Sequence, residues 1–155
     1  GPDFDDALLD LKIKSKDNNT LFKPLFRNQE NVKFVLDAMF ASTNEIRGTS
    51  YSSRINDKKY QFAGKTGTSQ VKRITEAQRE LDLDISQIPY EDRDHALYIA
   101  FGPYKNPRYA LSIVIEHGGS GGSAAAPIAK KLFKLIIDRH EERIKFNISN
   151  NNLQI

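Results

Sequence analysis

The most informative stretch of this 155-residue chain is Ala63-Gly64-Lys65-Thr66-Gly67-Thr68-Ser69. Because alternate residues of a β-strand point to the same face, the hydroxyls of Thr66 and Thr68 are expected on one side of a strand. Gly67 lets a second backbone approach and pair with the strand edge. Lys65 adds a positive charge beside it. The stretch therefore predicts a strand edge that binds an extended peptide ending in a carboxylate.

Two other interpretations compete with this one. A Lys-Thr-Gly triplet alone also arises by chance at strand ends and turns. Gly64-Lys65-Thr66 also matches the end of the phosphate-binding loop G-x-x-x-x-G-K-[ST]. That loop requires glycine at position 59, where this chain has Lys59, so a nucleotide site is disfavoured.

A helix is expected before this strand, which itself is predicted over residues 60–70. Asn28 is a favourable N-cap, and the apolar residues after it recur at helical spacing on one face, which predicts an end near residues 42–44. These apolar residues are Val32, Val35, Leu36, Met39 and Phe40. Further upstream, residues 7–13 fit either a strand or a single helical turn, and residues 21–26 predict a short extended piece.

After the strand, the sequence predicts a charged surface segment and then a hairpin. Residues 72–94 are highly charged, and residues 76–83 within them are compatible with a helix. Two apolar runs, 95–101 and 109–115, predict a pair of strands joined by a short loop. Neither run alternates cleanly between apolar and polar residues, so both faces of these strands are expected to be covered.

A long helix is predicted to close the chain. A glycine-rich loop over 117–123 precedes it, Ser123 is the expected cap, and Pro127 falls in the first turn, where proline is tolerated. The helix is predicted to end near Arg143, with fraying after Phe146. Its expected inner stripe consists of Ile128, Leu132, Leu135 and Ile136. The order of elements predicts an α/β fold of the α+β type, with an antiparallel sheet packed against this helix.

Composition excludes several classes of protein. Hydrophobic residues make up 39% and charged residues 28%, a globular balance. Lys plus Arg number 23 and Asp plus Glu 20, so the net charge is only +3 and no nucleic-acid partner is predicted. The absence of cysteine excludes disulfides, thiolate metal sites and cysteine nucleophiles. His95, His117 and His140 show no ligand-like spacing, so neither a metal nor a cofactor is expected.

Four segments carry a combination of motifs in a fixed order. They are FAGKTGTSQ at 62–70, RGTSY at 47–51, DHALYIAFGPY at 94–104 and EHGGSGGSAAAPIA at 116–129. Together they resemble the class B penicillin-binding proteins, and most of all their elongation-specific, rod-shape group. The match runs from about Asn31 to about His140. It implies the C-terminal part of the penicillin-binding protein/serine β-lactamase-like fold.

The resemblance implies a role for each residue of the Lys-Thr-Gly strand. Lys65 would supply positive potential and hydrogen-bond the proton-transfer network. The hydroxyls of Thr66 and Thr68 would bind the substrate carboxylate beside Gly67. The backbone N–H of Thr68 would be one of two oxyanion donors.

The two other catalytic motifs of the family, S-x-x-K and S-x-N, are not convincingly present. Ser69-Gln70-Val71-Lys72 has the first set of letters, but on a strand positions i and i+3 point to opposite faces. Ser42-Thr43-Asn44 has the second set, but it lies too close upstream of Lys65. The nucleophilic serine is therefore expected to be absent, and the chain itself inactive.

Domain boundaries follow from these motifs. Residues 1–2 are expected to be the remnant of a cleaved expression tag. Residues 3–146 are predicted to be a partial transpeptidase domain, and residues 147–155 a C-terminal tail. Because the missing part of the family domain supplies helices, an apolar sheet face is expected to be open in this chain, giving a dimer or low stability.

By resemblance, the parent protein is a serine-type D,D-transpeptidase that cross-links peptidoglycan through an acyl-enzyme. Its implied partners are stem peptides ending in D-Ala-D-Ala, β-lactams and membrane proteins of the rod complex. Its implied location is the bacterial inner membrane with the catalytic domain in the periplasm, the fragment itself being soluble. Two alternatives remain: a non-catalytic module that binds D-Ala-D-Ala peptides, and a related acyl-serine protein such as a β-lactamase or β-lactam sensor.

Overall fold

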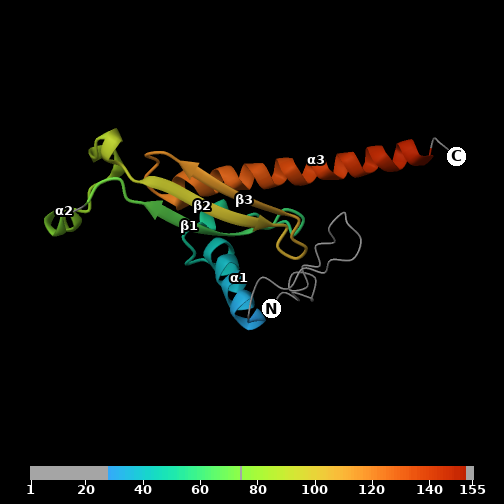
Figure 1. Ribbon diagram of the computed structural model, residues 1–155, viewed down its shortest axis with the longest axis horizontal. Coiled ribbons are helices and arrows are strands. Elements are labelled where there is room, and N and C mark those ends of the chain that lie inside the picture. The colour runs from blue at the N-terminus through green and yellow to red at the C-terminus, as the bar shows by residue number, and fades with distance from the viewer. Residues whose placement is uncertain (1–27, 74, 153–155) are drawn as a thin grey trace.

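A three-stranded antiparallel sheet lies at the centre of the computed structural model, which describes residues 28–73 and 75–152. Its strands are β1 (Ala63–Ser69), β2 (His95–Gly102) and β3 (Tyr109–Ile115), in the order β1-β2-β3. Two helices flank the sheet, α1 (Gln29–Asn44) and α3 (Ala126–Asn152) (Figure 1). The predicted α+β fold is confirmed, whereas the pieces predicted at residues 7–13 and 21–26 lie outside the described residues.

Strand β1 begins three residues later than the sequence predicts. The N–H groups of Tyr60 and Gln61 both donate to the carbonyl of Asp57, which makes a turn of the residues expected to open the strand. From Ala63 onward the register is regular, with Thr66 opposite Tyr98 of β2. The strand prediction is therefore confirmed for the Lys-Thr-Gly stretch and wrong for its first residues.

The charged segment between β1 and β2 is less helical than expected. Its helix α2 covers only Glu76–Glu80, and two short 3₁₀ turns follow at Ile85–Gln87 and Tyr90–Asp92. Asp82 has a φ of 39°, in the left-handed region, and it stands where the predicted helix would have continued. The charged segment projects from one end of the sheet, and the C-terminal end of α3 lies beyond the opposite end (Figure 1).

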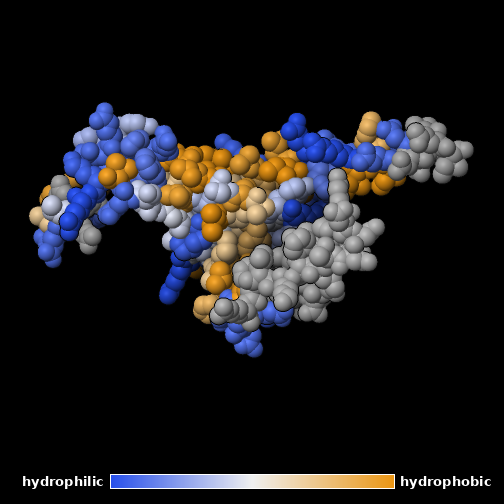
Figure 2. Space-filling view, viewed as in Figure 1, coloured by the Kyte–Doolittle hydropathy of each residue, from blue (hydrophilic) through white to orange (hydrophobic). Residues whose placement is uncertain are grey.

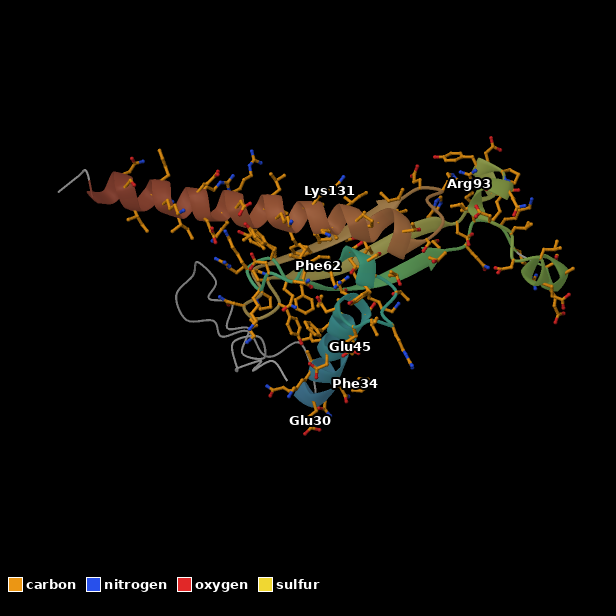
Figure 3. All side chains as sticks on the ribbon, turned by 180° about the vertical axis from the view of Figure 1, so that it is seen from behind. Glu30, Phe34, Glu45, Phe62, Arg93 and Lys131 are labelled. Carbon is orange, nitrogen blue, oxygen red and sulfur yellow. The ribbon has the colours of Figure 1, made fainter. Side chains whose placement is uncertain are left out.

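The hydrophobic core lies between α3 and one face of the sheet. Phe62 stacks on Phe133 of α3 with ring centroids 4.9 Å apart, and it meets Tyr98 of β2 edge-on. Figure 3 shows Phe62 in this position between the sheet and α3. The predicted inner stripe is wrong at Leu135, which is 54% exposed, and at Ile128, which is 36% exposed. The buried stripe of α3 consists instead of Ala126, Ala129, Phe133 and Ile137.

Both ends of α3 differ from the prediction. A π-helical turn at Gly121–Ala125 leads into it, and Ser123 does not cap its backbone. The helix continues to Asn152 rather than ending near Arg143. Residues 142–150 are all exposed, and Figure 1 shows this part of α3 running past the edge of the sheet.

The second face of the sheet is only partly covered. On this face Ile99 and Val114 are 52% and 56% exposed, so the expectation that both strand faces are covered is wrong. Met39 of α1 reaches one end of it and lines a shallow groove with Ile99 and Phe101. Apolar side chains reach the surface along the sheet and the first half of α3 (Figure 2). Among residues 28–73 and 75–152, no helix has the length and apolar character needed to cross a membrane.

Candidate functional site: the outer edge of strand β1

Strand β1 has one edge that pairs with β2 and one that pairs with no described strand. On this outer edge Thr43 of α1 occupies both backbone groups of Gly64. The Gly64 N–H donates to the Thr43 hydroxyl at 3.0 Å, and that hydroxyl lies 3.4 Å from the Gly64 carbonyl. Alternate residues of an antiparallel strand direct their backbone groups to the same edge. The N–H and C=O groups of Thr66 and Thr68 therefore face outward too. No described strand pairs with this edge from Thr66 onward, although the Thr66 carbonyl accepts a hydrogen bond from Lys65 Nζ.

The polar side chains expected on this strand are brought together at the open edge. The side chains of Thr66 and Thr68 share one face of β1, and Thr68 is exposed. Lys65 is exposed as well, and its Nζ donates to the carbonyl of Thr66 at 2.8 Å. The same Nζ lies 3.5 Å from the Thr66 hydroxyl oxygen. A cation, two hydroxyls and outward N–H groups thus line one short segment, which suits a carboxylate.

The two glycines of β1, Gly64 and Gly67, differ in the space that a side chain would have. A Cβ on Gly64 would lie 2.4 Å from the Tyr98 hydroxyl, so the Tyr98 ring occupies the space that a side chain would need. A Cβ on Gly67 would meet only the Leu97 Cβ at 3.4 Å, an ordinary contact. The structure therefore requires glycine at Gly64, which the sequence does not reveal, and not at Gly67, where glycine is predicted to matter.

A buried cluster of three hydroxyls holds β1 against α1. The Tyr98 hydroxyl lies 2.9 Å from both Thr43 and Ser50, which are 3.2 Å from each other. Burial raises the pKa of Tyr98 above its ordinary value of 10.0, so this phenol stays protonated at neutral pH. Thr43 and Ser50 are fully buried. No sequence signal identified these residues, because isolated hydroxyls look like ordinary surface positions.

Ser42, Thr43 and Asn44, which match S-x-N in sequence, hold strand β1 in place. Thr43 bonds Gly64 as described, and the Asn44 side-chain amide donates to the carbonyl of Phe62 at 2.9 Å. The Ser42 hydroxyl lies 3.2 Å from that of Thr49, which in turn lies 3.2 Å from that of Thr66. These residues therefore contact the candidate site from the end of α1 and fix its geometry.

The letters Ser69-Gln70-Val71-Lys72 do not form a catalytic pair. Lys72 donates instead to Asp92 at 2.9 Å in the charged segment. The phosphate-loop alternative is also disfavoured by the structure, because Gly64-Lys65-Thr66 lie inside an antiparallel strand and not in a loop that opens a helix.

His95 and His117 make structural contacts beside the C-terminal end of β1, whereas His140 of α3 packs edge-on against Tyr109. The His117 N–H donates to Nδ1 of His95 at 2.9 Å, and His117 Nδ1 lies 2.9 Å from the carbonyl of Arg93. In the described part of the chain, no three His, Cys, Asp or Glu residues gather as a metal site would require.

A pocket of about 440 Å³ lies beyond the C-terminal end of β1. It is enclosed by the charged segment on one side and by the glycine-rich loop on the other. Its lining includes Lys72, Arg73, Asp92, Arg93, Ser120 and Ser123. Figure 3 shows Arg93 in this region, at the end of the sheet opposite to the one nearest Phe62. An extended ligand on the open edge of β1 would run toward this pocket.

Sequence comparison identifies relatives of known activity. The family described as "Penicillin binding protein transpeptidase domain" matches residues 9–134. The peptidoglycan D,D-transpeptidase MrdA of Salmonella typhimurium is 40% identical over 104 residues, which cover 67% of this chain and 16% of that protein. The protein of the same name from Haemophilus influenzae is 31% identical over 111 residues, covering 71% of this chain and 16% of that protein.

Comparison of folds leads to the same group. PBP2 of Pseudomonas aeruginosa, in a crystal structure with WCK 5153, is similar with a TM-score of 0.56 and 28% identity, over 78% of this chain and 23% of that one. PBP2 in complex with MreC from Helicobacter pylori gives a TM-score of 0.54 and 31% identity, over 77% of this chain and 20% of that one. The chain thus spans 16% of the length of the two MrdA relatives and 20–23% of the two PBP2 chains.

Proposed function

Because this chain belongs to the penicillin-binding protein transpeptidase family, we propose that it supplies the carboxylate-binding strand of a PBP2-type peptidoglycan D,D-transpeptidase. One observation carries the proposal: the edge of β1 is open from Thr66 onward, with Lys65 and the Thr66 and Thr68 hydroxyls gathered on it. The relatives, which are named as D,D-transpeptidases, do not favour a standalone peptide-binding module.

The substrate is a stem peptide that ends in D-Ala-D-Ala. Its terminal carboxylate binds the Thr66 and Thr68 hydroxyls, and the Lys65 ammonium balances its charge. The peptide extends along β1 away from Gly64, because Thr43 already occupies the backbone groups there. Its backbone pairs with the outward N–H and C=O groups as an added strand.

The chemistry of the parent enzyme requires a serine from outside this chain. That serine attacks the carbonyl of the penultimate D-alanine, the terminal D-alanine leaves, and an acceptor amine resolves the acyl-enzyme. The Thr68 N–H donates to the oxyanion that forms on the attacked carbonyl. Loss of one such donor typically costs about 3–4 kcal/mol of transition-state stabilisation. β-Lactams acylate the same serine and place their carboxylate on the same strand.

The parent protein also has binding partners and a cellular location, which this chain alone does not determine. The Helicobacter pylori relative is described in complex with MreC. We extend this to the parent protein, which would assemble with membrane proteins of that kind. It would be anchored in the bacterial inner membrane with its catalytic domain in the periplasm.

Calorimetric titration with N-acetyl-D-Ala-D-Ala tests the proposed site. The free acid is expected to bind and its C-terminal amide to bind much more weakly, because the amide lacks the charge that Lys65 and the threonines recognise. Thr66→Val is expected to lower the affinity for the acid by roughly tenfold, the usual effect of losing a hydrogen bond to a charged group. Ser112→Ala, which removes an exposed hydroxyl on β3, serves as the control. Equal affinity for acid and amide would refute the carboxylate site.

A fluorescent penicillin tests the absence of the nucleophile. No covalent adduct with this chain is expected on a denaturing gel. A stoichiometric adduct at Ser69, or at any other residue, would show that the chain carries its own reactive serine.

A further inference from the structure

The hydroxyl of Thr66 has neighbours that set the direction of its proton. Resting on the proposed function, we propose that Thr49 is a positioning residue that turns the Thr66 hydroxyl into a dedicated donor toward the ligand carboxylate. Thr49 belongs to the loop after α1, and its hydroxyl oxygen lies 3.2 Å from that of Thr66. Thr49 is exposed, and its hydroxyl contacts that of Thr66, through which we place its effect on the ligand.

Counting protons and lone pairs shows what each direction of the Thr49–Thr66 hydrogen bond leaves for a ligand. A threonine hydroxyl has one proton to donate and two lone pairs to accept. The Lys65 ammonium can only donate hydrogen bonds, and its Nζ lies 3.5 Å from the Thr66 hydroxyl oxygen. Its charge therefore orients one lone pair of this oxygen toward the ammonium. If Thr49 donates to the second lone pair, the Thr66 proton is left free to point toward the open edge. A ligand group that meets this proton must be an acceptor, as a carboxylate is.

A third hydroxyl favours this direction over the reverse. The Ser42 oxygen lies 3.2 Å from the Thr49 oxygen, so Ser42 and Thr66 are the two outer members of three linked hydroxyls. When Ser42 donates to Thr49, Thr49 donates to Thr66 and Thr66 donates to the carboxylate, the three dipoles point the same way. Such chains strengthen each of their hydrogen bonds, and an anion at the open end favours this arrangement.

The backbone around Thr49 is held closely by its neighbours, which limits where its hydroxyl can lie. The Ser50 N–H donates to the carbonyl of Ser42 at 3.1 Å. A Cβ on Gly48 would lie 2.2 Å from that same carbonyl, and a Cβ on Gly122 would lie 2.5 Å from the carbonyl of Thr49. The end of α1 and the glycine-rich turn before α3 thus hold the loop from two sides. This clamp explains why a side chain outside β1 can orient one on it.

The first experiment measures the Thr66 rotamer in the absence of ligand. Three-bond couplings from the Thr66 methyl carbon to the backbone nitrogen and carbonyl carbon report its χ1 angle by NMR. A single rotamer is expected in the wild type and in Thr49→Ser, which keeps the hydroxyl. Averaging between rotamers is expected in Thr49→Val, which has the same shape without the hydroxyl. A single, unchanged rotamer in Thr49→Val would overturn the proposal.

The second experiment measures affinity for N-acetyl-D-Ala-D-Ala. Thr49→Val is expected to bind the acid about three- to tenfold more weakly, as for the loss of one orienting hydrogen bond. Thr49→Ser and the exposed control Ser52→Ala are expected to match the wild type. Wild-type affinity in Thr49→Val would also overturn the positioning role. If the wild type binds no peptide at all, the proposed function fails, and the rotamer measurement alone still decides the role of Thr49.

Discussion

At the residue scale, the geometry of the candidate site depends on side chains that face inward. Gly64 is the residue immediately before Lys65, and its missing side chain makes room for the Tyr98 ring. Tyr98 in turn holds Thr43 and Ser50, and Thr43 holds the backbone of Gly64. The position of the proposed carboxylate-binding residues is therefore set by a buried polar cluster on the inner side of β1.

Substitution of Gly64 is expected to be strongly destabilising. In Gly64→Ala the new Cβ would lie 2.4 Å from the Tyr98 hydroxyl, so Tyr98 must shift and its hydrogen bonds must lengthen. Overpacking of this kind typically costs about 1–3 kcal/mol in the free energy of unfolding, which urea denaturation measures. Gly67→Ala is the matched control, because its Cβ makes only a 3.4 Å contact, and it should change stability little. Equal losses in the two variants would contradict the steric role of Gly64.

The strand that carries Lys65, Thr66 and Thr68 is predictable from the sequence, whereas the cluster beneath it is not. The spacing of Thr66 and Thr68 predicts that they share one face of β1, and the role of these residues stays a prediction. Thr43 and Ser50 are single hydroxyls in polar stretches, and nothing local shows that folding buries them 2.9 Å from Tyr98, about fifty positions along the chain. Such partners become visible only when the strands and α1 are placed in three dimensions.

At the element scale, α3 shows both what apolar periodicity predicts and where it misleads. The existence of the helix was correctly predicted. The prediction of its buried face was wrong. The large residues Ile128 and Leu135 define an exposed stripe, whereas the buried stripe consists of Ala126, Ala129, Phe133 and Ile137. Close packing over the sheet favours the stripe with small residues near the glycine-rich turn. Large apolar side chains therefore marked the wrong face.

The middle of α3 is tied to the loop before β1 by a cluster of charged and polar groups. Tyr60 donates to Asp138 at 2.5 Å, and Lys59 pairs with Glu141 at 2.8 Å. The hydrogen bond from Tyr60 holds the pKa of Asp138 below its ordinary value of 3.8. A carboxyl group whose pKa is lower in the folded than in the unfolded state stabilises the fold at pH values above its unfolded-state pKa. This stabilisation is lost as the pH falls through the folded-state pKa.

Asp138→Asn should therefore remove a part of the acid sensitivity of the fold. At neutral pH the variant is expected to melt below the wild type, and the difference should shrink as the pH falls below 3.8, where Asp138 becomes protonated. Melting temperatures between pH 7 and pH 2 measure this. Glu142→Gln, an exposed position on the same helix, is the control. A difference that is constant across this range would contradict the assignment.

The last turns of α3 are expected to contribute little to stability. Residues 142–150 are exposed, and isolated helical turns of this length are marginal in water. Deleting residues 144–155 should leave the melting temperature of the remaining chain within a few degrees. In the full chain, amide hydrogens of residues 144–150 should exchange faster than those of residues 129–137. A large loss of stability on deletion would show that the end of α3 makes contacts that the structure lacks.

At the scale of the whole molecule, the sheet has one well-covered and one poorly covered face. The open face presents Ile99 and Val114, each more than half exposed, on adjacent strands. Exposed apolar surface of this kind tends to associate. The expectation of a dimer or of low stability therefore stays a prediction for this chain.

Sedimentation at several protein concentrations tests that prediction. The wild type is expected to self-associate as its concentration rises. The double variant Ile99→Lys with Val114→Lys is expected to shift toward the monomer, because association would bury two ammonium groups. Lys58→Ala, an exposed position outside the sheet, is the control. A monomeric wild type with a high melting temperature would argue against association through this face.

The proposal that the edge of β1 binds a carboxylate is tested most directly by the backbone amide signals of Thr66 and Thr68 during an NMR titration with N-acetyl-D-Ala-D-Ala. Saturable shifts concentrated on residues 65–70 are expected for the free acid, together with slowed hydrogen exchange at Thr68, whose N–H faces outward. The C-terminal amide of the same peptide should leave these signals almost unchanged. Shifts that cluster elsewhere in the chain, or that are the same for acid and amide, would contradict a carboxylate site on this strand.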